Sequence, residues 1–201
     1  MKGGKMIKIE DYAIFKEQIT VLKELSKDNS VKELPCYMTE IKAAAVDFDK
    51  VKTKYVNELG LSEEAATSVD ALINIMEHLT MIEFKNGNMK GEKRKVKDKI
   101  RDSLMIFCDI TGKNISETRQ SMDFILVYNL EKNPLPNQLT KGIVQESKSR
   151  TAIGKHFLQN GGQEYILFDL ERFKKLYFRD VHTYSQKEFE QYITGKLVVK
   201  S

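Results

Sequence analysis

The sequence predicts an α/β domain in which a central mixed β-sheet is flanked by α-helices. Two short apolar runs read as strands, the first opened by Asp70 and the second spanning Leu79 to Phe84, and they are close enough to form a hairpin. An amphipathic helix pattern follows, and then Met122 to Tyr128, a nearly continuous apolar run typical of a strand buried on both faces. Strand, helix and strand in this order favour a right-handed crossover, so the last strand is expected to lie parallel to the second.

The length and composition agree with one domain. A chain of 201 residues can bury a sizeable core, and its 41% apolar and 31% charged residues are compatible with a globular protein that has a well-solvated surface. We therefore expect one domain over residues 1–201, with its core at about 48–130. A helical N-terminal segment is expected at 10–27, and a C-terminal strand and helix at 164–194.

Apolar residues recur at helical spacing in two segments before the hairpin. The helix expected within residues 10–27 carries Tyr12, Phe15, Ile19 and Leu22. The second helix is expected to begin near residue 48 and carries Phe48, Val51, Tyr55 and Leu59, with Gly60 as a suitable terminator. Between the two, the run Ala43–Ala45 reads as more helical than extended.

A break is predicted after the last core strand. Residues 133–137, Asn-Pro-Leu-Pro-Asn, open a polar stretch that continues to about Gly162 and is expected to be a loop or a short helix near the site. This stretch is mildly basic through Lys148, Arg150, Lys155 and His156. Beyond it we expect a short strand at 165–168 and a helix at 170–177. A capping box, Ser185 to Glu188, opens a last helix.

Several classes of protein are disfavoured. The chain has no uninterrupted apolar segment of about 18 residues, so no membrane span is expected. The N-terminal residues lack the apolar core of a secretion signal, which makes the cytoplasm the expected compartment. Two cysteines, Cys36 and Cys108, are too few for a disulfide framework or a zinc site, and the three histidines have no ligand spacing. No phosphate-binding glycine loop is present.

Glu83 and Lys85 are the strongest candidates for a functional site. Side chains alternate along a strand, so these two point to the same side and Phe84 points to the other. If the preceding run folds back as a hairpin, Asp70 reaches the same end of the sheet. Two carboxylates beside an ammonium group suit a hard divalent cation and an activated water. The alternative is that Glu83 and Lys85 form a surface pair on an edge strand.

Context separates this Glu-x-Lys pattern from two others in the chain. Glu40 and Lys42 lead into the alanine run, which is more helical than extended. Glu146 and Lys148 lie in a polar stretch with little apolar material to bury. Only the pattern at residues 83–85 ends a strand-like run that follows another strand-like run carrying an acid.

The arrangement of Asp70, a hairpin-length gap, Glu83-Phe84-Lys85-Asn86-Gly87 and a basic helix resembles the PD-(D/E)XK nuclease superfamily, which has the restriction-endonuclease-like fold. The resemblance covers roughly residues 48–130, and its motif is short and degenerate. It departs at Val69, which stands where the proline in the motif's name would be; many members lack that proline.

The resemblance implies specific roles. Asp70 and Glu83 would bind Mg²⁺ or Mn²⁺, helped by the carbonyl of Phe84, and Lys85 would orient or deprotonate the attacking water or stabilise charge on the phosphate. Many members use a further glutamate on the helix before the sheet, for which Glu58 is the first candidate here. Glu40 is the second.

The helix after the hairpin is strongly basic. Its apolar stripe is formed by Val96, Ile100, Leu104 and Phe107. Helical phase predicts Lys93, Lys97 and Arg101 beside that stripe and Lys95, Lys99 and Asp102 on the far face. The basic edge is thus expected to approach the sheet that carries Glu83, where it would contact a phosphate backbone rather than only the solvent. The nucleic-acid-binding candidates are Lys90, Lys93, Arg94, Lys97 and Arg101.

The functional hypothesis is a metal-dependent endonuclease, a hydrolase of phosphodiester bonds that acts on nucleic acid, with DNA as the expected substrate. The small size favours a homodimer or a protein partner that addresses the second strand. The alternative is a non-catalytic module on the same fold that binds a protein or a nucleic acid and belongs to a defence or toxin system.

Overall fold

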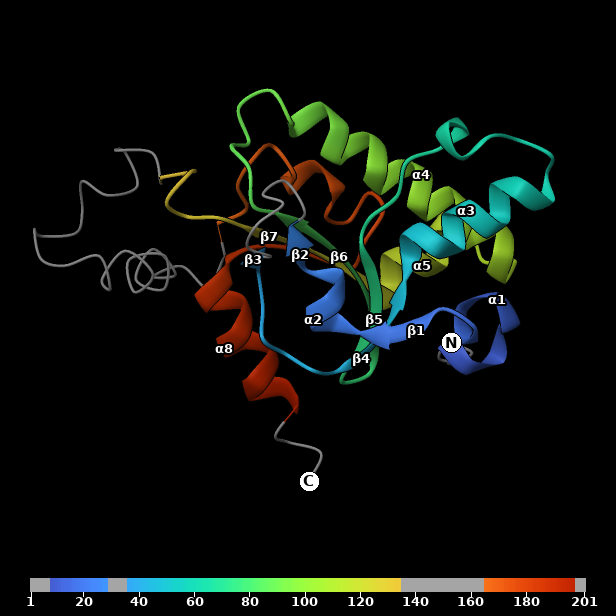
Figure 1. Ribbon diagram of the computed structural model, residues 1–201, viewed down its shortest axis with the longest axis horizontal. Helices are drawn as coiled ribbons and strands as arrows, with labels where there is room; N and C mark the ends of the chain where they lie inside the picture. Colours follow the sequence, from blue (N-terminus) through green and yellow to red (C-terminus); the bar gives the residue numbers. More distant parts are fainter. Residues whose placement is uncertain (1–7, 29–35, 135–164, 198–201) are drawn as a thin grey trace, which may run out of the picture.

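A computed structural model describes residues 8–28, 36–134 and 165–197 (Figure 1). Its centre is a mixed six-stranded sheet with the strand order β1-β4-β5-β6-β7-β8. The strands are β1 (Ile19–Val21), β4 (Ala44–Asp47), β5 (Ala71–Ile75), β6 (His78–Lys85), β7 (Met122–Tyr128) and β8 (Asp180–Ser185). The prediction of one α/β domain with a central mixed sheet flanked by helices is confirmed.

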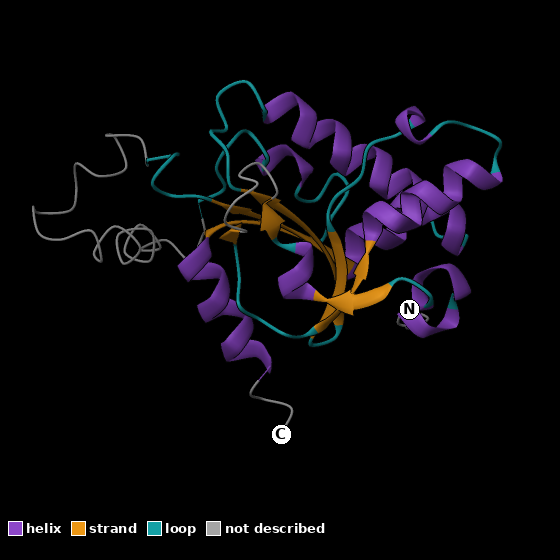
Figure 2. Cartoon of the chain, in the orientation of Figure 1, coloured by secondary structure: helices purple, strands orange, loops and turns teal. Residues whose placement is uncertain are grey.

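Helices cover both faces of this sheet (Figure 2). They are α1 (Ala13–Lys16), α2 (Leu22–Leu25), α3 (Phe48–Glu58), α4 (Lys93–Thr111), α5 (Ile115–Ser121) and α8 (Gln186–Leu197). Three 3₁₀ turns occur at Ile9–Asp11, Glu63–Ala65 and Glu171–Phe173. A separate antiparallel ribbon pairs β2 (Lys27–Asp28) with β3 (Cys36–Tyr37).

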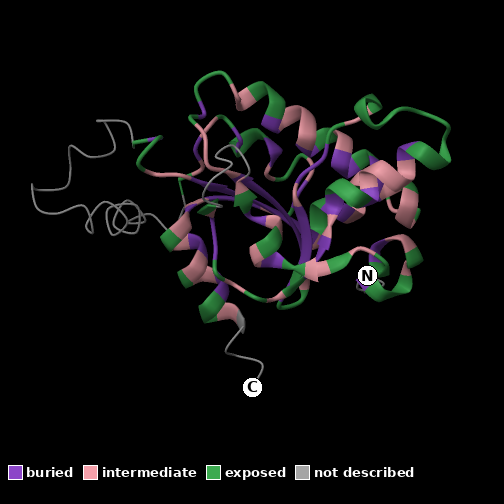
Figure 3. Ribbon diagram, in the orientation of Figure 1, coloured by how far each residue is buried: buried purple, intermediate pink, exposed green. Residues whose placement is uncertain are grey.

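Two apolar cores lie on opposite faces of the sheet (Figure 3). In the first core, residues of α1, α3 and α4 pack on alternate strand residues such as Leu72, Met81 and Phe124. In the second core, α2 and α8 pack on the intervening strand residues, which include Ile73 and Ile82. The period of two along each strand thus gives a three-layer arrangement in which both faces of the sheet are buried.

The central hairpin and the crossover agree with the sequence-based expectations. Strands β5 and β6 pair antiparallel, and β7 pairs parallel with β6 after the helix α4. All seven residues of β7 are buried, as expected for a strand covered on both faces. The helix expected near residue 48 is α3, which Asp47 caps at its N-terminus. Gly60 follows its end with φ +72°, a conformation that glycine adopts without strain.

The prediction for residues 10–27 was wrong. The segment contains a 3₁₀ turn, two single-turn helices and the strand β1 instead of one helix. The reason is visible in the cores: Phe15 is buried on one face of the sheet and Leu22 on the other. A continuous helix would keep both side chains on one face, whereas the observed chain passes around the edge of the sheet.

Three further expectations need correction. Ala44–Asp47 forms the strand β4, because β1 and β5 pair with it on either side. Residues 165–168 form no strand, and the only helical turn in 170–177 is Glu171–Phe173. The strand β8 that follows was not expected. The capping box at Ser185 is present, since Ser185 and Glu188 exchange backbone-to-side-chain hydrogen bonds at the start of α8.

The polar stretch after Pro134 lies outside the described residues as far as position 164, and with it Lys148, Arg150, Lys155 and His156. Within the part of the chain that the structure describes, no helix is long and apolar enough to cross a membrane.

Candidate functional site

Asp70 and Glu83 are brought together by the register of the hairpin. Ala71 pairs with Ile82, and the Asp70 N–H donates to the Ile82 carbonyl at 3.1 Å. Extending the register by one residue places Asp70 opposite Glu83. Directly opposed residues of an antiparallel pair have Cβ atoms about 4.5–5.5 Å apart, and like charges there repel. The site therefore begins with two neighbouring acids on one face of the sheet.

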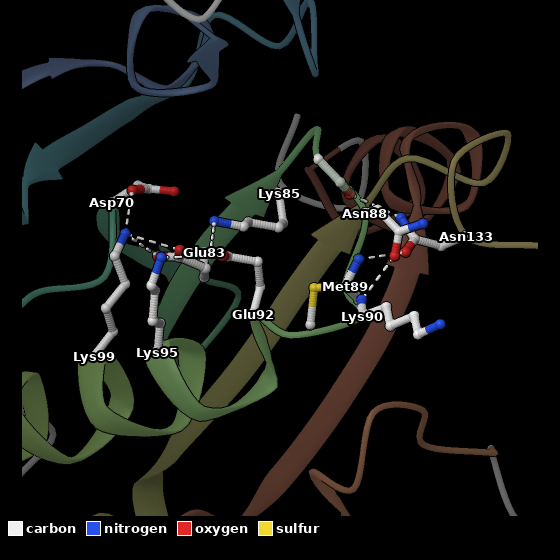
Figure 4. A network of polar contacts seen from close by, with 11 residues as sticks. Asp70, Glu83, Lys85, Asn88, Met89, Lys90, Glu92, Lys95, Lys99 and Asn133 are labelled. Carbon is white, nitrogen blue, oxygen red and sulfur yellow. Dashed lines mark hydrogen bonds and ion pairs between the residues drawn. The ribbon is translucent and has the colours of Figure 1, made fainter.

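The Lys99 ammonium group bridges these two acids (Figure 4). Its Nζ lies 2.8 and 2.9 Å from the two carboxylate oxygens of Glu83 and 3.4 Å from Oδ1 of Asp70. The Glu83 side chain is only 1% exposed, while those of Asp70 and Lys99 are 18% and 28% exposed. One cation can thus contact both carboxylates, and solvent reaches this cation from the Asp70 side.

The placement of Lys99 corrects the expected helical phase. We predicted Lys95, Lys99 and Asp102 on the far face of the helix, but Lys99 approaches Glu83. Lys99 is three residues after the buried Val96, and residues at this spacing share a helix face. That spacing is the signal in the sequence that could have identified Lys99. Asp102 also turns inward and accepts hydrogen bonds from Thr67.

The segment before β5 is held by both neighbouring helices, which fixes the start of the hairpin. The buried Val69 N–H donates to the Ser103 Oγ on α4 at 2.8 Å. The Ser68 hydroxyl hydrogen-bonds the Asp49 carboxylate on α3. Ser103 is one helical turn after Lys99, so the same helix that supplies the lysine also positions the backbone next to Asp70.

Electrostatics disfavour a negative charge on both acids of this site at once. Burial raises the pKa of Asp70 to about 6, although Lys99 and the Phe84 N–H oppose the rise. Burial and the neighbouring Asp70 raise the pKa of Glu83 well above its ordinary range. The acids in turn outweigh burial at Lys99 and raise the pKa of its ammonium group. Two acids share one ammonium, so a second cation would relieve the remaining repulsion.

Lys85 lies on the same face of β6 but has another partner. Its Nζ is 2.9 Å from the Glu92 carboxylate at the start of α4, and Glu92 also contacts Lys95. These two lysines lower the pKa of Glu92. The positive charge of Lys85 still acts on Glu83 through space, since it contributes a lowering of the pKa of that acid. The lysine in contact with both acids is thus Lys99.

Phe84 contributes its backbone N–H, which donates to Oδ2 of Asp70 at 2.6 Å. Coordination by its carbonyl remains a prediction. Glu58 lines the same cleft as Asp70, on the last turn of α3. Glu40, the second choice for this role, is exposed and pairs with Lys23. The charge of Asp49 acts on both Asp70 and Lys99, and no sequence pattern pointed to this residue.

A network of asparagines holds the loop between β6 and α4. Asn129 donates to Asn86, and Asn86 donates to Asp28 of the ribbon, at 2.7 and 2.6 Å. Asn133 accepts from the Met89 N–H and donates to the Gly87 carbonyl, at 2.6 and 2.9 Å. These contacts tie the loop to the end of β7 and to β2. The loop thus forms a fixed wall beside the site.

The basic residues of α4 are largely neutralised by acids. Lys93 and Lys97 both lie within ion-pair distance of Asp169, and Arg94 and Arg101 both lie within that distance of Asp98. Lys90 is exposed in the loop before the helix. The expectation that Lys93, Lys97 and Arg101 approach Glu83 does not agree with these contacts. Their role in nucleic-acid binding stays a prediction.

Two clefts meet at Asp70. The larger, of about 930 Å³, runs along α3 and is lined by Asp47, Asp49, Lys50, Lys54 and Glu58 among others. The smaller, of about 440 Å³, lies between the ribbon and the loop after β6, where Lys85, Asn86 and Asn88 line it. Because Asp70 lines both clefts, a ligand can approach it from either.

The donor set fits a hard divalent ion. Across residues 8–28, 36–134 and 165–197, no group of three or more His, Cys, Asp or Glu side chains is placed to hold a metal ion. Asp70 and Glu83 alone offer carboxylate oxygens that one cation, Lys99 Nζ, already contacts together. Mg²⁺ keeps several waters and needs only one or two protein carboxylates, so this pair is sufficient in chemistry and number.

Comparison with known proteins gives no guide to function: no family model matches the chain, and no curated protein or solved structure is significantly similar to it.

Proposed function

We propose that this protein is a metal-dependent nuclease of restriction-endonuclease-like fold, in which Asp70 and Glu83 hold Mg²⁺ or Mn²⁺ and DNA is the expected substrate. The observation that carries the proposal is the shared contact of both acids with Lys99 Nζ, 2.8 Å from Glu83 and 3.4 Å from Asp70. Two acids distant in the chain converge on one cation at the junction of two clefts. This convergence supports the proposal.

The metal, when bound, would lower the pKa of a water molecule and neutralise charge that grows on the phosphate. The side chains divide the remaining work. The Phe84 N–H, at 2.6 Å, fixes one oxygen of Asp70 and leaves Oδ1 directed at the shared cation position. Glu83 is held within the sheet, where burial keeps its orientation constant.

Lys99 takes the role that the motif gives to Lys85. The neighbouring acids raise the pKa of Lys99, so it stays protonated at neutral pH. A protonated lysine cannot accept a proton from water, but it can stabilise negative charge on a phosphate oxygen or give its proton to the leaving oxygen. Lys85 holds Glu92 at the start of α4 and adds positive charge at the same end of the strand.

Cleavage assays test this proposal. Labelled DNA and RNA, single-stranded and duplex, are incubated with the protein and Mg²⁺ or Mn²⁺. The wild type is expected to cut at least one of them, and EDTA or Glu83→Gln should abolish the activity. Glu10→Gln, which changes an exposed acid near the N-terminus, is the matched control and should cut at the wild-type rate. A folded Glu83→Gln protein with wild-type activity would refute the assigned site.

One observation favours a second candidate function. Lys99 contacts both acids directly, so the three residues can serve as a structural ion cluster in a non-catalytic binding module. Titration with Mn²⁺ separates the two functions. A nuclease site binds the ion, and its affinity is lost in Asp70→Asn, whereas a binding module shows no affinity that depends on Asp70.

A further inference from the structure

The two clefts beside the site share part of their lining. Three residues line both of them: Leu25, Lys27 and Asp70. Lys27 belongs to the ribbon strand β2, and Asp70 directly precedes β5. A ligand that extends from one cleft into the other therefore passes both Lys27 and Asp70.

The larger cleft is unfavourable for a phosphate chain. Besides Asp70, it is lined by the acids Glu24, Asp47, Asp49 and Glu58. Two of its lysines are already paired, Lys50 with Asp47 and Lys54 with Glu17. Acids thus outnumber unpaired lysines on this side, and a polyanion placed there would be repelled.

The smaller cleft carries a more even balance of charge. The lysines Lys27, Lys85 and Lys132 and the acids Asp28, Asp70 and Glu92 line it. Lys85 pairs with Glu92, whereas Lys27 and Lys132 are exposed. Within the described residues, neither Lys27 nor Lys132 has a carboxylate at ion-pair distance. Unpaired ammonium groups at the rim of a cleft are available to phosphate oxygens, which release counterions when they bind.

The basic helix offers less to a phosphate chain. The ion pairs of Lys93 and Lys97 with Asp169 would have to break, as would that of Arg101 with Asp98 at 3.2 Å. Lys27 and Lys132 have no ion pair to break before they contact a phosphate. The unpaired charges that line the clefts therefore lie on the ribbon, at Lys27, and in the turn after β7, at Lys132.

We propose that the smaller cleft holds single-stranded nucleic acid, with its phosphates contacted by Lys27 and Lys132. The class of partner rests on the proposed nuclease function; the location rests on the distribution of charge. Clefts of about 300–1,000 Å³ hold molecules the size of a drug. At about 440 Å³ this one suits a single nucleotide unit and excludes a duplex. Asp70, which lines this cleft, is the acid of the pair that a chain entering it would meet.

The salt dependence of binding tests this assignment. Affinity for a fluorescein-labelled single-stranded oligonucleotide is measured by anisotropy in EDTA, at several salt concentrations, so that no hydrolysis occurs. Each phosphate contact to a single strand contributes about 0.7 to the slope of log K against log salt. Lys27→Ala and Lys132→Ala should each reduce the slope by about that amount, and the double variant by about twice as much. Lys16→Ala, at an exposed position of α1 that lines neither cleft, is the matched control and should leave the slope unchanged. Lys93→Ala and Arg94→Ala test the competing site on α4.

The remaining outcomes are distinguishable. A reduced slope in the α4 variants with an unchanged slope in the cleft variants overturns the assignment. Absence of binding by the wild type, or equal affinity for a duplex of the same sequence, also overturns it. If the wild type binds through Lys27 and Lys132 but cuts nothing with Mn²⁺, the nuclease proposal fails and the cleft assignment stands. If it cuts and the cleft variants keep the wild-type slope, only the cleft assignment fails.

Discussion

Asp70 lies opposite Glu83 across the β5–β6 hairpin, and the two carboxylates share the ammonium group of Lys99. The pairing of the strands places like charges side by side, and a neighbouring helix supplies one cation to relieve their repulsion. Because two acids share one lysine, ionisation of both acids inside the fold is disfavoured. The predictions below follow from this imbalance.

Lys99 should matter more for activity than Lys85. Lys99→Met removes the only side-chain cation that contacts both acids among the described residues, whereas Lys85→Met removes a charge whose direct partner is Glu92. Loss of a charge-stabilising group typically lowers kcat by about 10²–10³-fold. We expect that loss for Lys99→Met and a smaller one for Lys85→Met, measured as kcat on the best substrate with folding checked by circular dichroism. Equal losses, or a larger one for Lys85→Met, would return the central role to Lys85.

The stability of the metal-free protein should depend on pH through Asp70. Its pKa is about 6 in the folded protein and 3.8 ordinarily, so the unfolded chain releases its proton first as the pH rises. Stability is therefore lost between about pH 4 and pH 6, by roughly 3 kcal/mol for this group. The Asn side chain of Asp70→Asn cannot ionise. The substitution also removes the neighbouring charge that helps to raise the pKa of Glu83.

Urea unfolding in EDTA at pH 4, 5, 6 and 7 measures this effect. The stability of Asp70→Asn relative to the wild type should increase over that range and then level off. A difference that stays constant with pH, or that decreases, would show that Asp70 carries no raised pKa. Asp98→Asn, which changes a surface acid of α4 that pairs with arginines, is the control.

Mn²⁺ should stabilise the wild type against heat. An ion at one hundred times its Kd stabilises the folded state by about 2.7 kcal/mol, which corresponds to a rise in Tm of roughly 5–10 °C for a chain of this size. Mn²⁺ should not raise the Tm of Asp70→Asn or Glu83→Gln, whereas it should raise the Tm of Asp98→Asn as it does that of the wild type. Differential scanning fluorimetry reports the shift. A rise of the same size in all four proteins would mean that the ion binds elsewhere.

Ser103 should position the site without touching substrate. Its Oγ is the acceptor for the buried Val69 N–H. Ser103→Ala leaves that donor unsatisfied at a cost of about 1–3 kcal/mol, and the start of the hairpin next to Asp70 is then less well fixed. We expect lower stability in urea and a weaker affinity for Mn²⁺. Ser116→Ala, at an exposed position of α5, is the control and should change neither. Unchanged Mn²⁺ affinity in Ser103→Ala would show that the hydrogen bond from Val69 to Ser103 serves stability alone.

Much of the fold could be predicted because local patterns and tertiary packing agree over its centre. The strand at Met122, the helix at Phe48 and the hairpin after Asp70 each have a period that matches the face they bury. The strands toward the β1 edge of the sheet could not be predicted in this way. Ala44–Asp47 has little intrinsic preference for a strand and becomes one because β1 and β5 pair with it.

The site was predicted in part. The convergence of Asp70 and Glu83 follows from hairpin pairing, which a short apolar alternation is enough to indicate. The choice of lysine does not follow from strand alternation. Lys85 points to the correct face, but the distance is set by α4, which packs on that face of the sheet and carries Lys99 to the acids. Which residue of a helix reaches a neighbouring strand depends on how the two elements pack, and the motif holds no information on this.

A crystal structure of the protein grown with Mn²⁺ tests the central claim most directly. We predict an anomalous peak within coordination distance of both Asp70 and Glu83, with the Lys99 ammonium group displaced toward the clefts. A crystal structure grown with the same Mn²⁺, in which Lys99 still bridges the two acids and no manganese lies between them, would contradict the account.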